Sequence, residues 1–185
     1  VVSTLEDLGL ADNTLVVFCS DNGGYLNYKG GFENISSNGP LRGQKTDLYE
    51  GGHRVPAIFY WPNRIRSGES EETVLTMDLF PTFTAVADAT SEETDVDGTD
   101  LSSFLFEDEN LQDRTIFWRA NEAWAVRQGP WKLYGDPKGV QLYNLDWDIG
   151  ETKDLSAEHP DLVARMTEAW KDWEADVDAS AEPFN

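Results

Sequence analysis

Four consecutive residues, Asp21-Asn22-Gly23-Gly24, place oxygen donors directly after an apolar segment. A carboxylate next to an amide oxygen is the hard ligand set that Ca²⁺ or Mg²⁺ prefers over softer metals. Adjacent side chains on a straight strand point to opposite faces, so both reach one ion only where the backbone turns, and two glycines favour such a turn. Asp21 and Asn22 are therefore candidate metal ligands. An ordinary Asp-Asn-Gly turn is the alternative.

A second group lies in the segment 39–56, with the sequence GPLRGQKTDLYEGGHRVP. Here glycines surround Lys45, Arg42 and Arg54 in an otherwise acidic chain. Cations in a glycine-rich loop suit an anionic substrate group whose charge must be stabilised during transfer. The alternative for the two arginines is a surface position paired with nearby carboxylates. Glu50 and Arg54 are expected to form such an ion pair and to hold the loop.

The elements that would position these groups come first in the chain. The apolar runs 14–19 and 57–61 predict strands buried on both faces, as in a parallel sheet. Ligands gather at the carboxyl ends of such strands, where Asp21 lies. The stretch 25–52 is too long and irregular for an ordinary connection, and loops of that length are usually functional or disordered. Residues 78–87 predict a helix, with Asp78 as its cap.

The chain changes character after an acidic linker at 90–100. Four short predicted strands are separated by turn residues, at 115–118, 123–127, 132–134 and 141–145. An amphipathic helix from Pro160 to about Ala175 should pack on the resulting antiparallel sheet. The expected fold class is therefore α/β, with the end of an α/β sheet domain in residues 1–100 and a small α+β subdomain in residues 101–185.

The composition is that of a folded, strongly acidic protein. A hydrophobic content of 39% with 12% aromatic residues is enough for a core, and the net charge is -21. Nucleic acid is excluded as a partner because no basic stripe is present. The acidity fits a cation-binding protein or an acidic interaction tail less well than adaptation to high salt, because Asp and Glu are spread along the chain.

The only cysteine and the chain ends add further expectations. Cys19 allows no internal disulfide and is expected in the core. No signal-peptide pattern and no apolar run near ~18 residues occurs, so no membrane partner is expected. The chain starts inside a predicted helix at residues 1–8, as a fragment would. A targeting signal would lie upstream, and the compartment stays open.

Together these segments resemble the type I, formylglycine-dependent sulfatase (arylsulfatase) family of the alkaline-phosphatase superfamily. The motifs TLVVFCSDNG at 14–23 and GPLRGQKTDLYEGGHRVP at 39–56 match its C-terminal signature. The resemblance extends through DLFPT at 78–82, AVRQGPWKL at 125–133 and LYNLDWDIGE at 142–151. It implies a C-terminal fragment of an alkaline-phosphatase-like fold, which would make residues 1–100 the end of the catalytic domain.

The resemblance implies roles for three residues. Asp21 and Asn22 match the family's metal ligands, with Ca²⁺ expected before Mg²⁺, and Lys45 matches the lysine that contacts the sulfate. His53 stands where the family usually has an apolar residue and is given no catalytic role. The family's nucleophile is a formylglycine made from Cys or Ser in a C-x-P-x-R or S-x-P-x-R motif. Cys19 is followed by Ser20 and Asp21, so that residue is expected upstream.

The expected activity is therefore hydrolysis of a sulfate ester by the full-length parent, with a sulfated small molecule or carbohydrate as substrate. The upstream half of the enzyme is an expected partner, and the chain alone should be inactive. A phosphonate or phosphate monoester hydrolase of the same superfamily is one alternative, and a non-catalytic, acidic Ca²⁺-binding module is another. Trp124 and Trp147 are read as core residues, with sugar stacking as the alternative.

Overall fold

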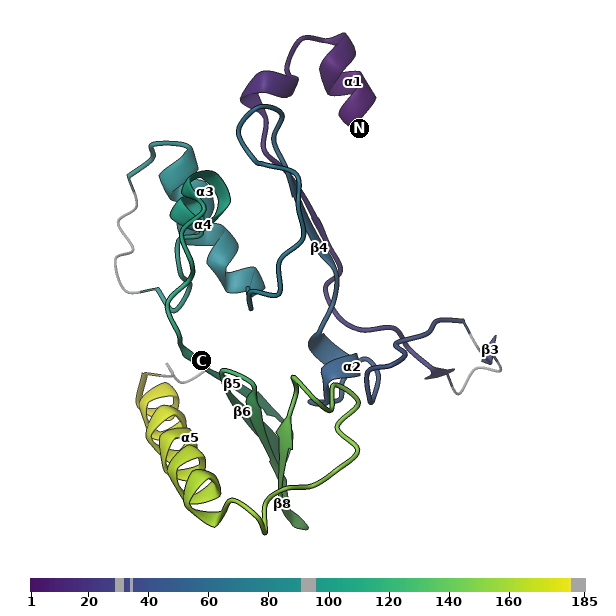
Figure 1. The fold of residues 1–185 in the computed structure, drawn as a ribbon, viewed down its shortest axis with the longest axis vertical. Helices are drawn as coiled ribbons and strands as arrows, with labels where there is room; N and C mark the ends of the chain where they lie inside the picture. Colours follow the sequence, from purple (N-terminus) through teal and green to yellow (C-terminus); the bar gives the residue numbers. More distant parts are fainter. Residues whose placement is uncertain (29–31, 34, 91–95, 181–185) are drawn as a thin grey trace, which may run out of the picture. The chain divides into compact units, whose positions relative to one another are not determined.

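A computed structural model describes residues 1–28, 32–33, 35–90 and 96–180 of the chain (Figure 1). The helices are α1 (Val2–Asp7), α2 (Glu50–His53), α3 (Leu79–Val86), α4 (Ser102–Glu107) and α5 (Pro160–Ser180), with 3₁₀ turns η1 (Ala11–Asn13) and η2 (Thr76–Asp78). The strands are β1 (Val16–Cys19), β2 (Asn27–Tyr28), β3 (Phe32–Glu33), β4 (Ala57–Tyr60), β5 (Thr115–Ala120), β6 (Ala123–Gln128), β7 (Trp131–Asp136) and β8 (Gly139–Asn144). Part of the predicted linker at 90–100 lies outside the described residues.

Contacts divide the chain into two compact units that are each discontinuous in sequence. The first comprises Val1–Phe18 with Ala57–Gln112, and the second comprises Cys19–Pro56 with Asp113–Asn185. The segment 19–56 therefore packs with the C-terminal sheet. A division into continuous domains 1–100 and 101–185 stays a prediction.

In the first unit, β1 and β4 pair with each other as a two-stranded sheet. Phe18 is 67% exposed and Ile58 is 57% exposed. The prediction that both strands are buried on both faces is therefore wrong for the described chain. A two-stranded sheet has no further strands or helices to cover both of its faces. Cys19 is half-buried rather than in the core.

The helical part of the first unit surrounds the buried carboxylate of Asp78. Its Oδ2 accepts a hydrogen bond from the Leu75 N–H at 2.7 Å, and its Oδ1 accepts one from the Thr99 N–H at 2.9 Å. Thr82 Oγ1 in turn accepts from the Leu101 N–H at 2.9 Å. Asp78 is the N-cap residue of α3 but makes no side-chain cap bond to that helix. The predicted capping role is thus corrected, since this carboxylate satisfies backbone N–H groups outside α3.

The second unit is built on an antiparallel meander in the order β5-β6-β7-β8. The pairs Ala120↔Ala123, Gln128↔Trp131 and Asp136↔Gly139 close three two-residue hairpins. Asn121 and Gly129 adopt positive φ, as tight hairpin turns require. The four predicted strands are confirmed and are longer than the sequence indicated.

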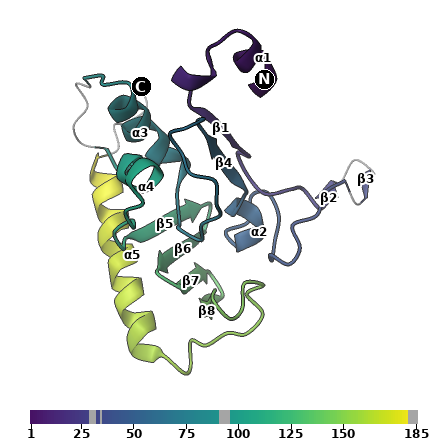
Figure 2. The same cartoon turned by 45° about the horizontal axis from the view of Figure 1, so that its top comes forward.

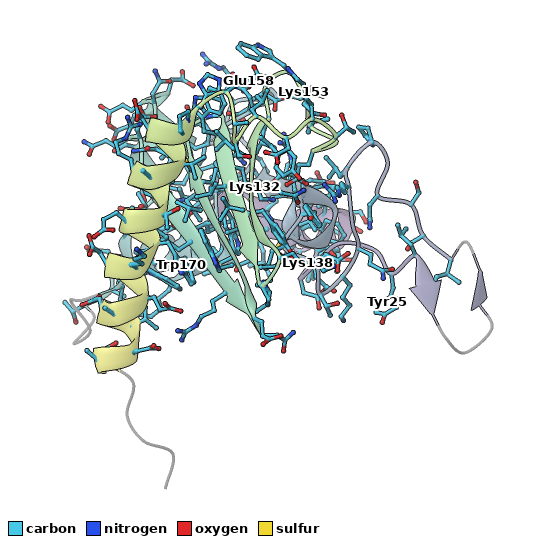
Figure 3. The ribbon with its side chains drawn as sticks, turned by 90° about the horizontal axis from the view of Figure 1, so that it is seen from below. Tyr25, Lys132, Lys138, Lys153, Glu158 and Trp170 are labelled. Carbon is cyan, nitrogen blue, oxygen red and sulfur yellow. The ribbon has the colours of Figure 1, made fainter. Side chains whose placement is uncertain are left out.

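Helix α5 covers one face of this sheet. Trp170 and Met166 of α5 pack with Val126, Leu133 and Leu142 of the strands in a single apolar core. Trp170 also stacks on Trp124 with ring centroids 5.1 Å apart, and it lies on the side of α5 that faces the sheet (Figure 3). The predicted packing of the C-terminal helix and the core role of Trp124 are confirmed.

The opposite face of the sheet receives helix α2 and the segment that leads into it (Figure 2). Side chains alternate along a strand, so the neighbours of Leu133 on β7, Lys132 and Tyr134, point away from α5. Lys132 is nevertheless fully buried. Across the described residues, no helix combines the length and the apolar character needed to cross a membrane.

Candidate functional site

The turn that follows β1 presents the two candidate metal ligands. Asp21 is exposed and Asn22 is half-buried. The Ser20 hydroxyl donates to the Asn22 carbonyl at 2.8 Å, and the Gly24 N–H donates to Asn38 Oδ1 at 2.7 Å. The backbone of this turn is therefore held from both sides while the Asp21 carboxylate faces solvent.

Lys45 lies on a second turn that contacts the first through the backbone. The Lys45 N–H donates to the Gly24 carbonyl at 3.2 Å. Asp47 Oδ2 accepts from the Gln44 N–H at 3.0 Å, which closes the turn, and Thr46 within it has φ +82°. The Lys45 side chain is exposed. The structure thus brings together the backbones of the two segments that sequence reasoning selected.

Glycines of α2 form the contact surface for both turns. The Gly23 N–H donates to the Gly52 carbonyl at 2.9 Å, and the Gly51 N–H donates to the Arg42 carbonyl at 2.6 Å. A Cβ atom at Gly52 would lie 2.0 Å from the Asp47 carbonyl oxygen, and one at Gly23 would lie 1.8 Å from that of Gly51. Real side chains do not fit at these distances, so only glycine permits this packing.

Lys132, Glu50 and Glu151 form a group of buried charges where α2 meets the sheet, which we call the buried ion cluster. All three side chains are 0% exposed. Lys132 Nζ is 2.8 Å from Glu50 Oε1 and 2.9 Å from Glu151 Oε1. Both contacts are ion pairs between buried groups. Glu151 Oε2 accepts the Glu50 N–H at 2.7 Å, which joins the start of α2 to the chain after β8.

His53 is a further neighbour of the Lys132 ammonium. Its Nε2 lies 3.1 Å from Lys132 Nζ and 3.3 Å from the Leu48 carbonyl. The Lys132 ammonium can only donate and the Leu48 carbonyl can only accept, so Nε2 can hydrogen-bond one of them but not both at once, and the ring tautomer decides which. The ring also stacks on Trp118 with centroids 4.6 Å apart. Burial, together with the Lys132 charge, lowers the pKa of His53 to about 4.

Two arginines complete the charges around Glu50. Arg54 Nη1 and Arg127 Nη1 lie 3.5 Å and 3.8 Å from Glu50 Oε2. Burial opposes ionisation of Glu50, but Lys132 with the other cations lowers the pKa of this carboxyl below its usual value. The predicted Glu50–Arg54 pair is confirmed, although Lys132 is the closer partner.

Arg42 makes contacts within the protein, although the residue is exposed. Its Nη1 donates to Tyr143 Oη at 3.0 Å and to the Glu151 carbonyl at 2.9 Å. Its guanidinium lies 3.8 Å from the centre of the Tyr49 ring, as in a cation–π contact. These partners are a hydroxyl, a backbone carbonyl and an aromatic ring rather than carboxylates, and a role of Arg42 in anion binding stays a prediction.

The oxygen donors of the turn fit a hard divalent cation in type but not in number. Calcium takes roughly 6–8 oxygen ligands, and Asp21 and Asn22 supply side-chain oxygens of the appropriate kind. Among the described residues, no three His, Cys, Asp or Glu side chains lie close enough to share an ion. A calcium ion at this turn would need its remaining ligands from water, from the backbone or from other parts of the protein.

Comparison with known proteins identifies the family of this chain. A family model described as Sulfatase matches residues 1–89. A sulfatase of Formosa agariphila is 33% identical over 192 positions, which cover 89% of this chain and 34% of that protein. This chain belongs to the sulfatase family.

Other proteins similar to this sulfatase chain include one that is named for a sugar and one that was crystallised with an oligosaccharide. An N-acetylgalactosamine-6-O-sulfatase of Bacteroides thetaiotaomicron is 27% identical, with 91% of this chain and 38% of that protein covered. A crystal structure of Ps i-CgsB in complex with k-i-k-neocarrahexaose gives a TM-score of 0.80 at 35% identity, and covers 93% of this chain and 39% of that chain. The α/β sulfatase fold is thereby confirmed, and this chain spans about a third of the length of the curated relatives it matches.

Sequence reasoning missed Lys132 and Glu151. Both lie in stretches that carry the family resemblance, at 125–133 and 142–151, and that position was the only available signal. The prediction that Trp147 is a core residue is wrong, since its side chain is 82% exposed on the turn after β8.

Proposed function

We propose that the full-length protein is a metal-dependent sulfuric ester hydrolase of the arylsulfatase type, and that this chain supplies one side of its active site. The observation that carries the proposal is the backbone contact between the oxygen-donor turn and the Lys45 turn, at Lys45 N–H to Gly24 O. One turn offers ligands for a cation and the other offers an ammonium group. An anionic ester needs both kinds of charge stabilisation.

In this proposal each residue has a defined task. Asp21 and Asn22 hold Ca²⁺, with Mg²⁺ as the less favoured ion, and the cation when bound neutralises charge on the sulfate oxygens. Lys45 places its ammonium against the same sulfate and stabilises the negative charge that develops during transfer. His53 takes no direct part, because it is engaged in protein contacts.

The nucleophile is proposed to lie outside this chain. The sequence contains no C-x-P-x-R or S-x-P-x-R motif, and Cys19 is followed by Ser20 and Asp21. A formylglycine in another part of the full-length protein is the proposed nucleophile. The 185-residue chain alone should therefore give no turnover, and measurable turnover by it would contradict this account.

A sulfated carbohydrate is the proposed substrate class. The support is the substrate that the Bacteroides thetaiotaomicron relative carries in its name and the oligosaccharide present in the Ps i-CgsB crystal structure. The exposed Trp147 offers an aromatic surface of the kind that contacts sugar rings.

Lys45→Ala in the full-length protein tests the proposal. We expect kcat for sulfate ester hydrolysis to fall by about 10²–10³, as when one donor to a developing anion is removed. Lys138→Ala is the matched control, because Lys138 is also exposed but lies on the β7–β8 hairpin. Turnover close to that of the unaltered protein would remove Lys45 from the mechanism.

The same assay distinguishes the two alternatives. A panel of matched sulfate, phosphate and phosphonate esters should show preference for sulfate, and preference for a phosphorus ester would indicate the related hydrolase. Calcium binding without turnover of any ester by the full-length protein would indicate a non-catalytic module.

A further inference from the structure

We propose that the buried ion cluster Lys132–Glu50–Glu151 is a positioning device for Lys45, through which the C-terminal sheet controls the geometry of the active site. The inference rests on the proposed function. Nothing in the family comparison assigns a role to these three residues in this chain.

Helix α2 is too short to be stable without the residues around it. It has four residues, from Glu50 to His53, and no side-chain cap at its N-terminus. A single turn of helix is not stable alone, because nucleation costs more than one hydrogen bond returns. The position of α2 must therefore be set by what surrounds it.

Both turns, the one that carries Asp21 and Asn22 and the one that carries Lys45, contact α2 directly. Gly52 accepts from the Gly23 N–H, and the Cβ positions of Gly51 and Gly52 lie within 3 Å of carbonyl oxygens of Arg42, Gln44 and Asp47. These are backbone contacts with no room for adjustment by side chains. A displacement of α2 therefore displaces the turn that carries Lys45.

The buried ion cluster joins α2 to the sheet. Lys132 is on β7 and Glu151 follows β8, and together they bind the side chain and the backbone N–H of Glu50. Figure 3 shows Lys132 between the strands and the coil of α2. Removing water from three charges requires good mutual geometry, and such a cluster favours one arrangement over its neighbours.

The test is a double-mutant cycle in the full-length protein at saturating Ca²⁺. Glu151→Gln keeps the side-chain size and an oxygen that accepts the Glu50 N–H. It removes the negative charge that Glu151 presents to Lys132. We expect kcat to fall about tenfold to a hundredfold, as a displacement near 1 Å can cause. In the Lys45→Ala background, Glu151→Gln should lower kcat by less than about threefold. A residue that acts only through Lys45 has little further effect once Lys45 has been removed.

Lys153→Met is the matched control, since Lys153 and Glu158 form an exposed ion pair at 3.1 Å in the same unit. It should change kcat by less than about twofold. Equal losses from Glu151→Gln with and without Lys45 would overturn the proposal. So would an unchanged kcat in the Glu151→Gln protein.

Hydrogen exchange provides a readout that does not need activity. In the Glu151→Gln protein, exchange in peptides from 39–56 should rise about tenfold or more while peptides from α5 stay unchanged. Equal increases in both regions would mean that the cluster only stabilises the unit, and no increase would mean that it does not hold the loop. If the unaltered protein hydrolyses no sulfate ester, the proposed function fails. The change in hydrogen exchange still tests whether the buried ion cluster holds the segment 39–56 in place.

Discussion

Lys132→Met measures how much the buried ammonium contributes to stability. The substitution keeps an unbranched side chain of similar length but removes the ammonium that lies against both buried carboxylates. Glu50 keeps the more distant Arg54 and Arg127, whereas Glu151 loses its ion-pair partner. Removing one partner of a buried ion pair costs about 3–5 kcal/mol, mostly from the uncompensated charge that remains. The exposed pair of Lys153 and Glu158, with side chains 67% and 57% exposed, should contribute about 0–1 kcal/mol.

Urea denaturation of the full-length protein, followed by tryptophan fluorescence, compares the two lysines. The free energy of unfolding should fall by several times more for Lys132→Met than for Lys153→Met, with the same dependence on urea concentration. If the two variants lose the same stability, the buried cluster is not the strong interaction that its geometry indicates.

A triple variant separates charge from packing. Lys132→Met combined with Glu50→Gln and Glu151→Gln removes the carboxylate charges that Lys132→Met leaves without the ammonium. It should be more stable than Lys132→Met alone, because neutral groups are less costly to bury than unpaired ions. A triple variant that is less stable still would show that the side-chain packing, rather than the charge, dominates.

Three further predictions concern other residues. Because the pKa of His53 falls from 6.5 in the unfolded chain to about 4 on folding, the folded protein should lose stability as the pH drops through this window. His53→Val should remove this loss, which is on the order of 3 kcal/mol, in melting curves at several pH values. Asp21→Ala should weaken Ca²⁺ binding by the full-length protein about tenfold or more in calorimetry, and unchanged affinity would exclude Asp21 as a ligand. Trp147→Ala should change the free energy of unfolding by less than about 0.5 kcal/mol, whereas Trp170→Ala should cost about 3–5 kcal/mol.

The elements that sequence reasoning located well are those whose pattern is local. The meander at 115–144 and helix α5 follow from alternating side chains, hairpin turns and one apolar helix face, all of which are visible within a few residues. The same holds for the pair of Glu50 and Arg54, which are four positions apart.

The features that were missed depend on contacts between distant segments. Glu50 and Lys132 are 82 positions apart, and a lysine on a strand is normally exposed, so nothing in the sequence predicts its burial. The strands β1 and β4 were expected to be covered because their composition is apolar. Composition does not show how many neighbouring strands this chain provides, and the chain leaves Phe18 and Ile58 exposed.

The order β5-β6-β7-β8 has a consequence for how the second unit assembles. Each strand pairs with its successor in the chain, so the meander can form from short hairpins with little loss of chain entropy. The segment 19–56 is separated from it by residues 57–112 and needs a finished surface that displays Lys132. We therefore expect this segment to dock last during folding, so that Lys45 reaches its place only after the sheet has formed.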